Sequence, residues 1–181
     1  METIINKTRL ECVTGNIVRE TTDAIVNAAN EELSGGGGVD GAIHYSGGPA
    51  IAEECQAIID SIGRLEPGCC ALTSGGKLKA RFVIHTVGPA WQGGKAGEEE
   101  VLRRAHRNSL IMAAEKELAS IAFPAISTGT FRYPKIRAAL AAMDETVTFL
   151  RQDSRLALVR FVLIDDSTRR MYEDAVHLCG G

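Results

Sequence analysis

The sequence lacks an uninterrupted apolar stretch long enough to span a bilayer, so we expect no transmembrane helix. Its first residues, Met1 to Lys7, also lack the basic and then apolar order of a signal peptide. The five cysteines are an odd number, and Cys69 and Cys70 are adjacent, which does not indicate a disulfide framework. Free or buried thiols are typical of a reducing compartment. We therefore expect a cytoplasmic protein with no membrane partner.

An excess of positive charge is missing as well. The chain of 181 residues has a net charge of −3, which provides no general attraction for nucleic acid or for anionic membranes. A ligand that carries phosphate would have to be held by local geometry instead. The length and the hydrophobic content of 45% predict a single globular domain over residues 1–181, without linker, repeat or low-complexity segment.

Several catalytic and metal-binding motifs are absent. There is no Gly-x-Ser-x-Gly, which argues against an ordinary serine hydrolase, and Gly75-Gly76-Lys77 lacks the spacing and the hydroxyl residue of a P-loop. His44, His85, His106 and His177 are scattered, and no cysteine or histidine pair has the spacing of zinc ligands. We expect no metal ion and no cofactor. The cysteines are interpreted as packing residues: Cys12, Cys55, Cys69, Cys70 and Cys179.

What the sequence does contain is a run of four glycines, Gly35 to Gly38, directly before a segment compatible with a helix. Glycine-rich loops that lead into a helix N-terminus bind phosphates, because free N–H groups and the helix dipole both favour an anion. Asp40 lies in the first turn of that helix, where an acid can stabilise the helix or take part in catalysis. Gly36-x-Gly38-x-x-Gly41 matches the dinucleotide fingerprint in letters, but it does not follow a strand directly.

Apolar, β-branched runs alternate with segments of helical spacing. This alternation, with strands that are apolar throughout, predicts a three-layer α/β/α sandwich. The predicted strands are Leu10–Val13, Ala24–Asn27, Cys69–Thr73, Phe82–Val87, Ile121–Ile126 and Leu156–Ile164. The predicted helices are Val39–Ile62, Glu98–Leu118, Pro134–Arg151, with Pro134 as the first helical residue, and Thr168–Leu178.

Ligands in such folds lie at the carboxyl ends of the strands. Three loops are then candidates: Thr14–Ile17, Asn27–Asp40 and Ser127–Tyr133. The last is a second loop of small residues before a helix, so the two loops could hold a diphosphate between them. Asn27 and Asn30 add amides that both donate and accept hydrogen bonds, as ribose hydroxyls require.

Four blocks of the sequence, Val26–Asn30, Gly35–His44, His85–Pro89 and Phe123–Gly129, together resemble the macrodomain family, most of all its MacroD-type branch. The resemblance implies the macrodomain sandwich with a mixed, mostly parallel sheet. It also implies binding of ADP-ribose and hydrolysis of O-acetyl-ADP-ribose, or removal of mono-ADP-ribose from acidic side chains of proteins. Nucleic acid is not an expected partner.

The resemblance also implies roles for residues. Asp40 would be the catalytic acidic residue and Asn30 would bind the distal ribose, whereas Asn16 and Ile17 would contact the adenine. The residues implied around the diphosphate and the distal ribose are Gly37, Gly38, Val39, Asp40, Ser127, Thr128, Gly129, Thr130, Phe131 and Arg132.

The chain departs from the family pattern at four positions. Asn16 stands where the family usually has aspartate, and Arg132 stands where it usually has glycine. Tyr45 replaces a common arginine, and Ile164 occupies a place where many members have an aromatic ring. A neutral acceptor at Asn16 is weaker than a charged one. The guanidinium of Arg132 could bind a phosphate or remain in solvent.

The hypothesis for the reaction is attack by a water that Asp40 and a phosphate oxygen position while Asn30 holds the ribose, without a metal ion. Simpler interpretations stay open: Asp40 as an acid that stabilises its helix, Asn30 as a turn residue, and Phe131 as a core residue. Two alternative functions also stay open, a non-catalytic module that binds ADP-ribose and a phosphatase for ADP-ribose 1″-phosphate.

Overall fold

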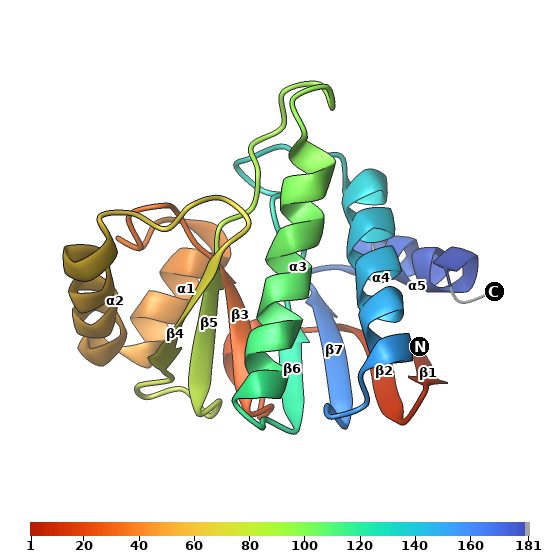
Figure 1. Cartoon of the computed structure of the whole chain (residues 1–181), viewed down its shortest axis with the longest axis horizontal. Coiled ribbons are helices and arrows are strands. Elements are labelled where there is room, and N and C mark those ends of the chain that lie inside the picture. Colours follow the sequence, from red (N-terminus) through yellow and green to blue (C-terminus); the bar gives the residue numbers. More distant parts are fainter. Residues whose placement is uncertain (180–181) are drawn as a thin grey trace.

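A seven-stranded sheet forms the centre of the computed structural model, which describes residues 1–179 (Figure 1). The strands are β1 (Glu2–Ile5), β2 (Thr8–Thr14), β3 (Ala24–Ala28), β4 (Cys70–Ser74), β5 (Phe82–Thr86), β6 (Ser120–Phe123) and β7 (Leu158–Leu163). The helices are the 3₁₀ turn η1 (Ile17–Arg19), α1 (Gly38–Gly47), α2 (Pro49–Ile62), α3 (Glu98–Glu115), α4 (Lys135–Gln152) and α5 (Asp166–Cys179). The three-layer α/β/α class is confirmed.

The sheet is mixed and mostly parallel, with the order β1-β2-β7-β6-β3-β5-β4. Each neighbouring pair from β2 to β5 is parallel. Only the edge strands run the other way, since β1 is antiparallel to β2 and β4 is antiparallel to β5. Strand β1 is absent from the sequence prediction. Its burial alternates between exposed and half-buried positions, so it lacks the continuous apolar run that identifies the central strands.

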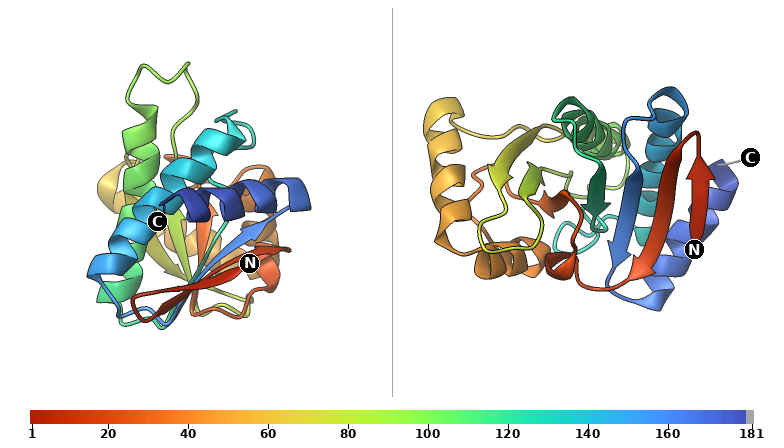
Figure 2. Two further views of the ribbon diagram at one scale, coloured as in Figure 1. Left: turned by 90° about the vertical axis from the view of Figure 1, so that its right-hand side faces the viewer. Right: turned by 90° about the horizontal axis from the view of Figure 1, so that it is seen from below.

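Two hydrophobic cores cover the two faces of the sheet. In β3, Ala24 and Val26 belong to one core and Ile25 to the other, because successive side chains of a strand point to opposite faces. Helices α3, α4 and α5 lie over the first face, whereas α1 and η1 lie over the second (Figure 2). Helix α2 packs at the sheet edge beside β4 (Figure 1).

Two predicted helix boundaries are wrong. The single helix expected over Val39–Ile62 is two helices, because Gly48 has a φ of +76°, a conformation that favours glycine and cannot continue α1. Pro49 then occupies the first turn of α2, where its missing N–H has no cost. Pro134, expected as the first helical residue, is the N-cap of α4.

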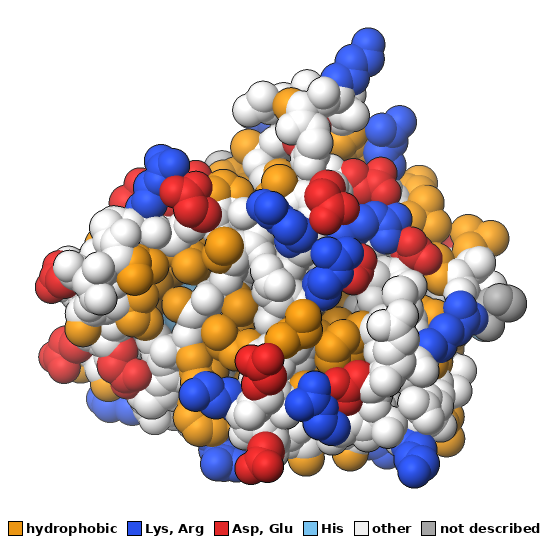
Figure 3. Space-filling model, in the orientation of Figure 1, with side chains coloured by type: hydrophobic (Ala, Val, Ile, Leu, Met, Phe, Trp, Pro, Cys, Tyr) orange, Lys and Arg blue, Asp and Glu red, His pale blue; other side chains and the backbone are white. Residues whose placement is uncertain are grey.

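The outer surface of α3 and α4 carries ion pairs that join the two helices. Arg103 Nη1 lies 2.6 Å from Asp144 Oδ2, and Arg107 Nε lies 2.6 Å from Glu145 Oε1. Acidic and basic side chains accordingly alternate over these helices in the space-filling view (Figure 3). Within residues 1–179, none of the helices has both the length and the apolar character that crossing a bilayer requires.

Candidate functional site

A cavity of about 300 Å³ lies between the N-terminus of α1 and the loop that follows β6. Both walls come from loops at the carboxyl ends of parallel strands, which is where α/β folds bind ligands. The cavity is lined by Ala28, Ala29, Asn30, Gly36, Gly37, Gly38, Val39, Asp40, Gly88, Ala125, Ile126, Ser127, Gly129, Thr130 and Phe131.

The glycine run forms the first wall. Gly37 is the N-cap of α1 and offers no side chain to cap it, so the first N–H groups of the helix are left for a ligand. Gly41 lets the run lie close against the helix, because a Cβ there would be 2.3 Å from the carbonyl oxygen of Gly36. The arrangement suits a phosphate, as predicted from the sequence.

The loop after β6 forms the second wall. Tyr133 N–H donates to the Ser127 carbonyl over 2.9 Å, and Arg132 N–H donates to the Gly129 carbonyl over the same distance, so the loop is closed on itself. The Ser127 hydroxyl is buried and has no hydrogen-bond partner in the described part of the chain. A buried, unpartnered donor that lines a cavity is available to a ligand oxygen.

Asp40 lies in the first turn of α1 and is only 6% exposed. Asn27 Nδ2 donates to Asp40 Oδ1 over 2.7 Å, and His44 Nε2, one helical turn away, lies 3.4 Å from the same oxygen. The other carboxylate oxygen, Oδ2, lies beside Gly36, where a Cβ would be 3.4 Å away. Asp40 is thus held through one oxygen and presents the other toward the glycine run that lines the cavity.

A buried chain of polar groups continues behind Asp40. His85 Nδ1 lies 3.1 Å from Asn27 Nδ2, and His85 Nε2 lies 2.9 Å from Thr73 Oγ1. Because the Asn27 amide nitrogen is a donor, we assign His85 Nδ1 as the acceptor and Nε2–H as the donor to Thr73. Burial, and next the nearby His44, lowers the pKa of His85 to about 3. His85 is therefore neutral and fixes the orientation of Asn27.

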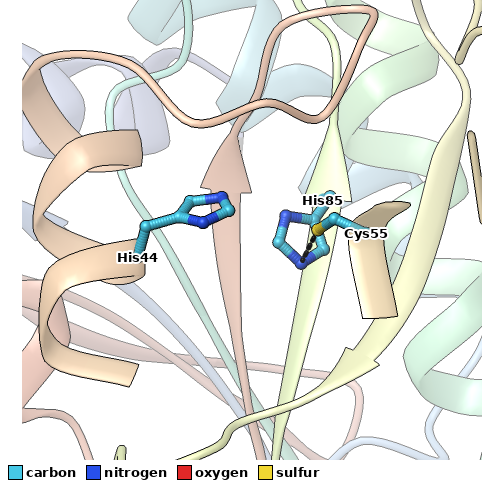
Figure 4. Close-up of side chains that lie close together, drawn as sticks. All are labelled: His44, Cys55 and His85. Atoms are coloured by element: carbon cyan, nitrogen blue, oxygen red, sulfur yellow. Dashed lines mark hydrogen bonds between the residues drawn. The ribbon is translucent and has the colours of Figure 1, made fainter. Parts of the chain in front are cut away.

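His44, Cys55 and His85 lie close together although they come from α1, α2 and β5 (Figure 4). One ligand atom from each residue lies within 4.8 Å of the others, an arrangement that the sequence spacing did not reveal. Both ring nitrogens of His85 already have polar partners, and burial raises the pKa of the Cys55 thiol to about 11. His85 supports Asp40 indirectly, through the hydrogen bond to Asn27, and a metal ion that bound His85 would have to displace Asn27 or Thr73.

Asn30 holds the loop that it begins. Its Nδ2 donates to Ser34 Oγ over 2.9 Å and to the Gly35 carbonyl over 3.1 Å, and its Oδ1 accepts from Ser34 N–H over 3.0 Å. These hydrogen bonds within the loop agree with the simple interpretation of Asn30 as a turn residue. Because Asn30 also lines the cavity, its role toward a ribose stays a prediction.

The structure brings most of the predicted ligand residues to the cavity but leaves four outside its lining. Arg132 is exposed, and Thr128 donates its hydroxyl to the Ala125 carbonyl. Asn16 and Ile17 follow β2; Ile17 is buried in the core, and Asn16 is exposed and caps η1 through Val18 N–H.

Gly88 is a lining residue that the sequence reasoning missed. A Cβ at this position would be 2.2 Å from Ser127 Oγ, so only glycine lets the loops after β5 and β6 approach this closely. The signal was available as Gly88-Pro89, directly after the predicted strand Phe82–Val87. The predicted loop Asn27–Asp40 contains three other lining residues, Ala28, Ala29 and Gly36, to which no individual role was assigned. The lining residues Ala125 and Ile126 directly precede the predicted loop Ser127–Tyr133.

Comparison with known proteins gives concordant matches. The Macro domain family model matches residues 26–142, more than half of the chain. An O-acetyl-ADP-ribose deacetylase from Salmonella typhimurium is 46% identical over 164 residues, 91% of this chain and 92% of that protein. A macrodomain mutant from Oceanobacillus iheyensis, solved with ADPR, has a TM-score of 0.95 and 41% identity and covers 98% of this chain and 97% of its own. A Trypanosoma brucei macrodomain in complex with ADP-ribose has a TM-score of 0.83 and 37% identity, and the match covers 94% of this chain and 69% of that one.

Proposed function

The chain belongs to the macrodomain family, and from this premise we propose that it binds ADP-ribose and hydrolyses acyl esters at the distal ribose. The observation that carries the proposal is the placement of Asp40. A buried carboxylate, held through Oδ1, presents Oδ2 toward the glycine run of the cavity. An acid that served only to stabilise the helix would need neither the burial nor the hydrogen bond from Asn27.

The order of the strands supports one orientation of the ligand. Asn16 and Ile17 follow β2 and lie on the far side of β7 and β6 from Asn30, which follows β3. In the proposed orientation the adenine lies over β2 and β7, and the diphosphate lies between the α1 N-terminus and the loop after β6. The distal ribose then reaches Asn30 and Asp40 over β3.

The proposed reaction needs only water as co-reactant. Asp40 Oδ2 accepts a proton from a water whose oxygen bonds to the acyl carbon of the ester, and the bond from that carbon to the ribose oxygen breaks. The proton passes to the ribose oxygen, so the products are a carboxylic acid and ADP-ribose. General-base assistance of this kind contributes roughly 10²–10⁴-fold to the rate. The same step would release ADP-ribose from a glutamyl ester of a protein.

We propose that this step needs no metal ion, since the cluster of His44, Cys55 and His85 lies behind Asp40 and both ring nitrogens of His85 already have hydrogen-bond partners. The cytoplasmic location and the single domain over residues 1–181 stay predictions.

A non-catalytic module that binds ADP-ribose is the second candidate function. The observation in its favour is Asn30, whose amide N–H groups both donate within the loop, to Ser34 and Gly35. In that case the cavity would bind the nucleotide without positioning the ribose for attack. Asn16, a neutral acceptor that already caps η1, lowers the affinity expected at the adenine but does not distinguish the two candidates.

Assays of binding and of hydrolysis on the wild-type protein decide between the candidates. Calorimetry with ADP-ribose measures binding, which both candidates require. Acetate release from O-acetyl-ADP-ribose, and ADP-ribose release from a peptide with an ADP-ribosylated glutamate, measure hydrolysis. The proposal expects turnover in the first hydrolysis assay. Binding without turnover in either assay identifies the non-catalytic module, and phosphate release from ADP-ribose 1″-phosphate alone identifies the phosphatase.

A further inference from the structure

A second cavity, of about 450 Å³, adjoins the one that holds Asp40. Asn30, Gly88 and Phe131 line both cavities, so the two meet at these residues. The far wall of the second cavity is formed by the segment after β5, residues 87–97, which rises above α3 (Figure 1). Trp91 N–H donates to the Phe131 carbonyl over 2.8 Å and thereby joins this segment to the wall of the first cavity.

The position of the second cavity follows from the strand order. The proposed ligand extends from β2 through β7 and β6 to β3, and the next strand in the sheet is β5. Any group attached to the distal ribose therefore continues toward the loop after β5, which lines the second cavity.

The walls of the second cavity are mainly apolar, with Pro67, Val87, Pro89, Ala90, Val101 and Phe131 among them. The described lining residues include neither lysine nor arginine. Glu98 also lines it, but its carboxylate already accepts hydrogen bonds from the backbone N–H groups of Gln92, Gly94 and Ala96. These bonds hold the 92–96 segment in place and leave the wall preformed.

Two further carboxylates belong to the lining, Glu31 and Glu32. Glu31 Oε2 lies 3.5 Å from Arg64 Nη1. Glu32, the next residue in the chain, is exposed. A negatively charged ligand would meet these carboxylates without a cation in the lining to balance its own charge.

We propose that the second cavity is a subsite for the acyl group of the ester, and that it accepts an uncharged aliphatic acyl chain longer than acetyl. The proposal rests on the proposed function, because it places the ester at the junction of the two cavities. The reaction is unchanged: water adds to the acyl carbon, the ester bond to the ribose oxygen breaks, and a longer carboxylic acid leaves with ADP-ribose.

The test compares four esters of ADP-ribose, with acetyl, butyryl, hexanoyl and succinyl groups, on the wild-type protein. We expect the kcat/KM of the butyryl and hexanoyl esters to equal or exceed that of the acetyl ester, because added methylenes enter an apolar site. The succinyl ester has the length of the butyryl ester but a free carboxylate, and we expect its kcat/KM to be at least about tenfold lower. A butyryl ester hydrolysed about tenfold more slowly than the acetyl ester would contradict the subsite.

Variants connect the selectivity to the cavity. Ala90→Trp adds a large ring at an exposed lining position, and we expect it to lower kcat/KM for hexanoyl by at least about tenfold and to change the acetyl value less than about twofold. Lys95→Trp is the matched control, since it adds the same ring in the same segment outside the lining. Glu32→Lys should raise the ratio of succinyl to butyryl turnover by at least about threefold.

The outcomes separate the subsite from the proposed function. Hydrolysis of the acetyl ester with equal losses of acetyl and hexanoyl turnover in Ala90→Trp would overturn the subsite and leave the proposed function intact. Hydrolysis of no ester by a protein that binds ADP-ribose would overturn both. Release of ADP-ribose from the glutamyl peptide, together with a hexanoyl kcat/KM that Ala90→Trp leaves unchanged, would assign the cavity to a protein segment instead and overturn the acyl subsite.

Discussion

The orientation of the Asp40 carboxylate depends on Asn27, which donates a hydrogen bond to it from β3. His85 on β5 in turn orients Asn27. These three side chains come from separate elements and are buried. A buried carboxylate that receives a hydrogen bond is held in one geometry, which a residue that activates water requires.

Replacement of Asn27 by aspartate tests this contact. In Asn27→Asp the second carboxylate would lie 2.7 Å from Asp40 Oδ1 at the present geometry, and two carboxylates so close hold on to a shared proton. We expect kcat/KM for O-acetyl-ADP-ribose at pH 7 to fall by at least about tenfold, because the hydrogen-bond donor to Asp40 is replaced by a second acid. Thr73→Val is the control, because it removes the partner of His85 without adding charge. A kcat/KM of Asn27→Asp equal to that of the wild type would show that the contact between Asn27 and Asp40 does not support the reaction.

The backbone conformation at position 132 favours glycine, the residue that the family resemblance leads us to expect in place of Arg132. Its φ of +58° lies in the left-handed region, where glycine has no steric cost, so the glycine that is usual here fits the loop better. We expect Arg132→Gly to raise the free energy of unfolding by about 0.5–1 kcal/mol in urea denaturation. Arg132→Ala retains the strain and loses the guanidinium, so a fall in ADP-ribose affinity in both variants would identify a phosphate contact. A destabilised Arg132→Gly would contradict the argument from strain.

At the level of elements, the site is made by the approach of the loop after β5 to the loop after β6. Gly88 permits this approach, since a Cβ would meet Ser127 Oγ at 2.2 Å and Ile126 Cγ2 at 2.6 Å. We expect Gly88→Ala to lower the free energy of unfolding by about 1–3 kcal/mol, as overpacking does in other interiors. Gly129→Ala is the matched control, because Gly129 lines the same cavity and has no atom within 4 Å of the added Cβ. Equal stability of the two variants would refute the close approach.

Which helices, strands and side-chain contacts the sequence predicts depends on whether the signal is local. The central strands and the loops after β3 and β6 follow from apolar runs and small residues, and the structure brings Asp40 and the glycine run to the cavity at the ends of these strands. The break at Gly48 was missed because a lone glycine between helical segments does not reveal its φ. The cluster of His44, Cys55 and His85 was missed for another reason: the residues meet only through the packing of α1, α2 and β5.

At the level of the whole molecule, the two cores leave two histidines buried and uncharged. His106 is 1% exposed and stacks on Phe123 with ring centroids 5.4 Å apart, and burial lowers its pKa to about 4. The pKa of His85 is lowered to about 3 by burial and next by His44. Because both pKa values lie below the ordinary 6.5, the unfolded chain binds more protons between these limits.

The contribution of these two histidines to the free energy of unfolding should therefore be complete above about pH 6.5. It should be lost progressively as the pH decreases toward 4. We expect His106→Phe to reduce the loss of unfolding free energy between pH 7 and pH 4.5 by about 2–3 kcal/mol in urea denaturation. The variant keeps an aromatic ring in the core but has no imidazole to bind a proton. His177→Gln, at an exposed position, should leave the loss unchanged. If His106→Phe and the wild type lose stability in parallel, then His106 is not held neutral by the fold.

The order of the strands arranges the loops that would hold adenine, diphosphate, ribose and acyl group along one edge of the sheet. The central claim is that this edge is a hydrolytic site which acts through Asp40. The most direct test is the turnover of Asp40→Ala on O-acetyl-ADP-ribose, with the affinity for ADP-ribose measured on the same preparation. We predict that kcat falls by about 10²–10⁴-fold while the Kd for ADP-ribose changes less than about threefold. Turnover of Asp40→Ala at the wild-type rate would contradict the claim.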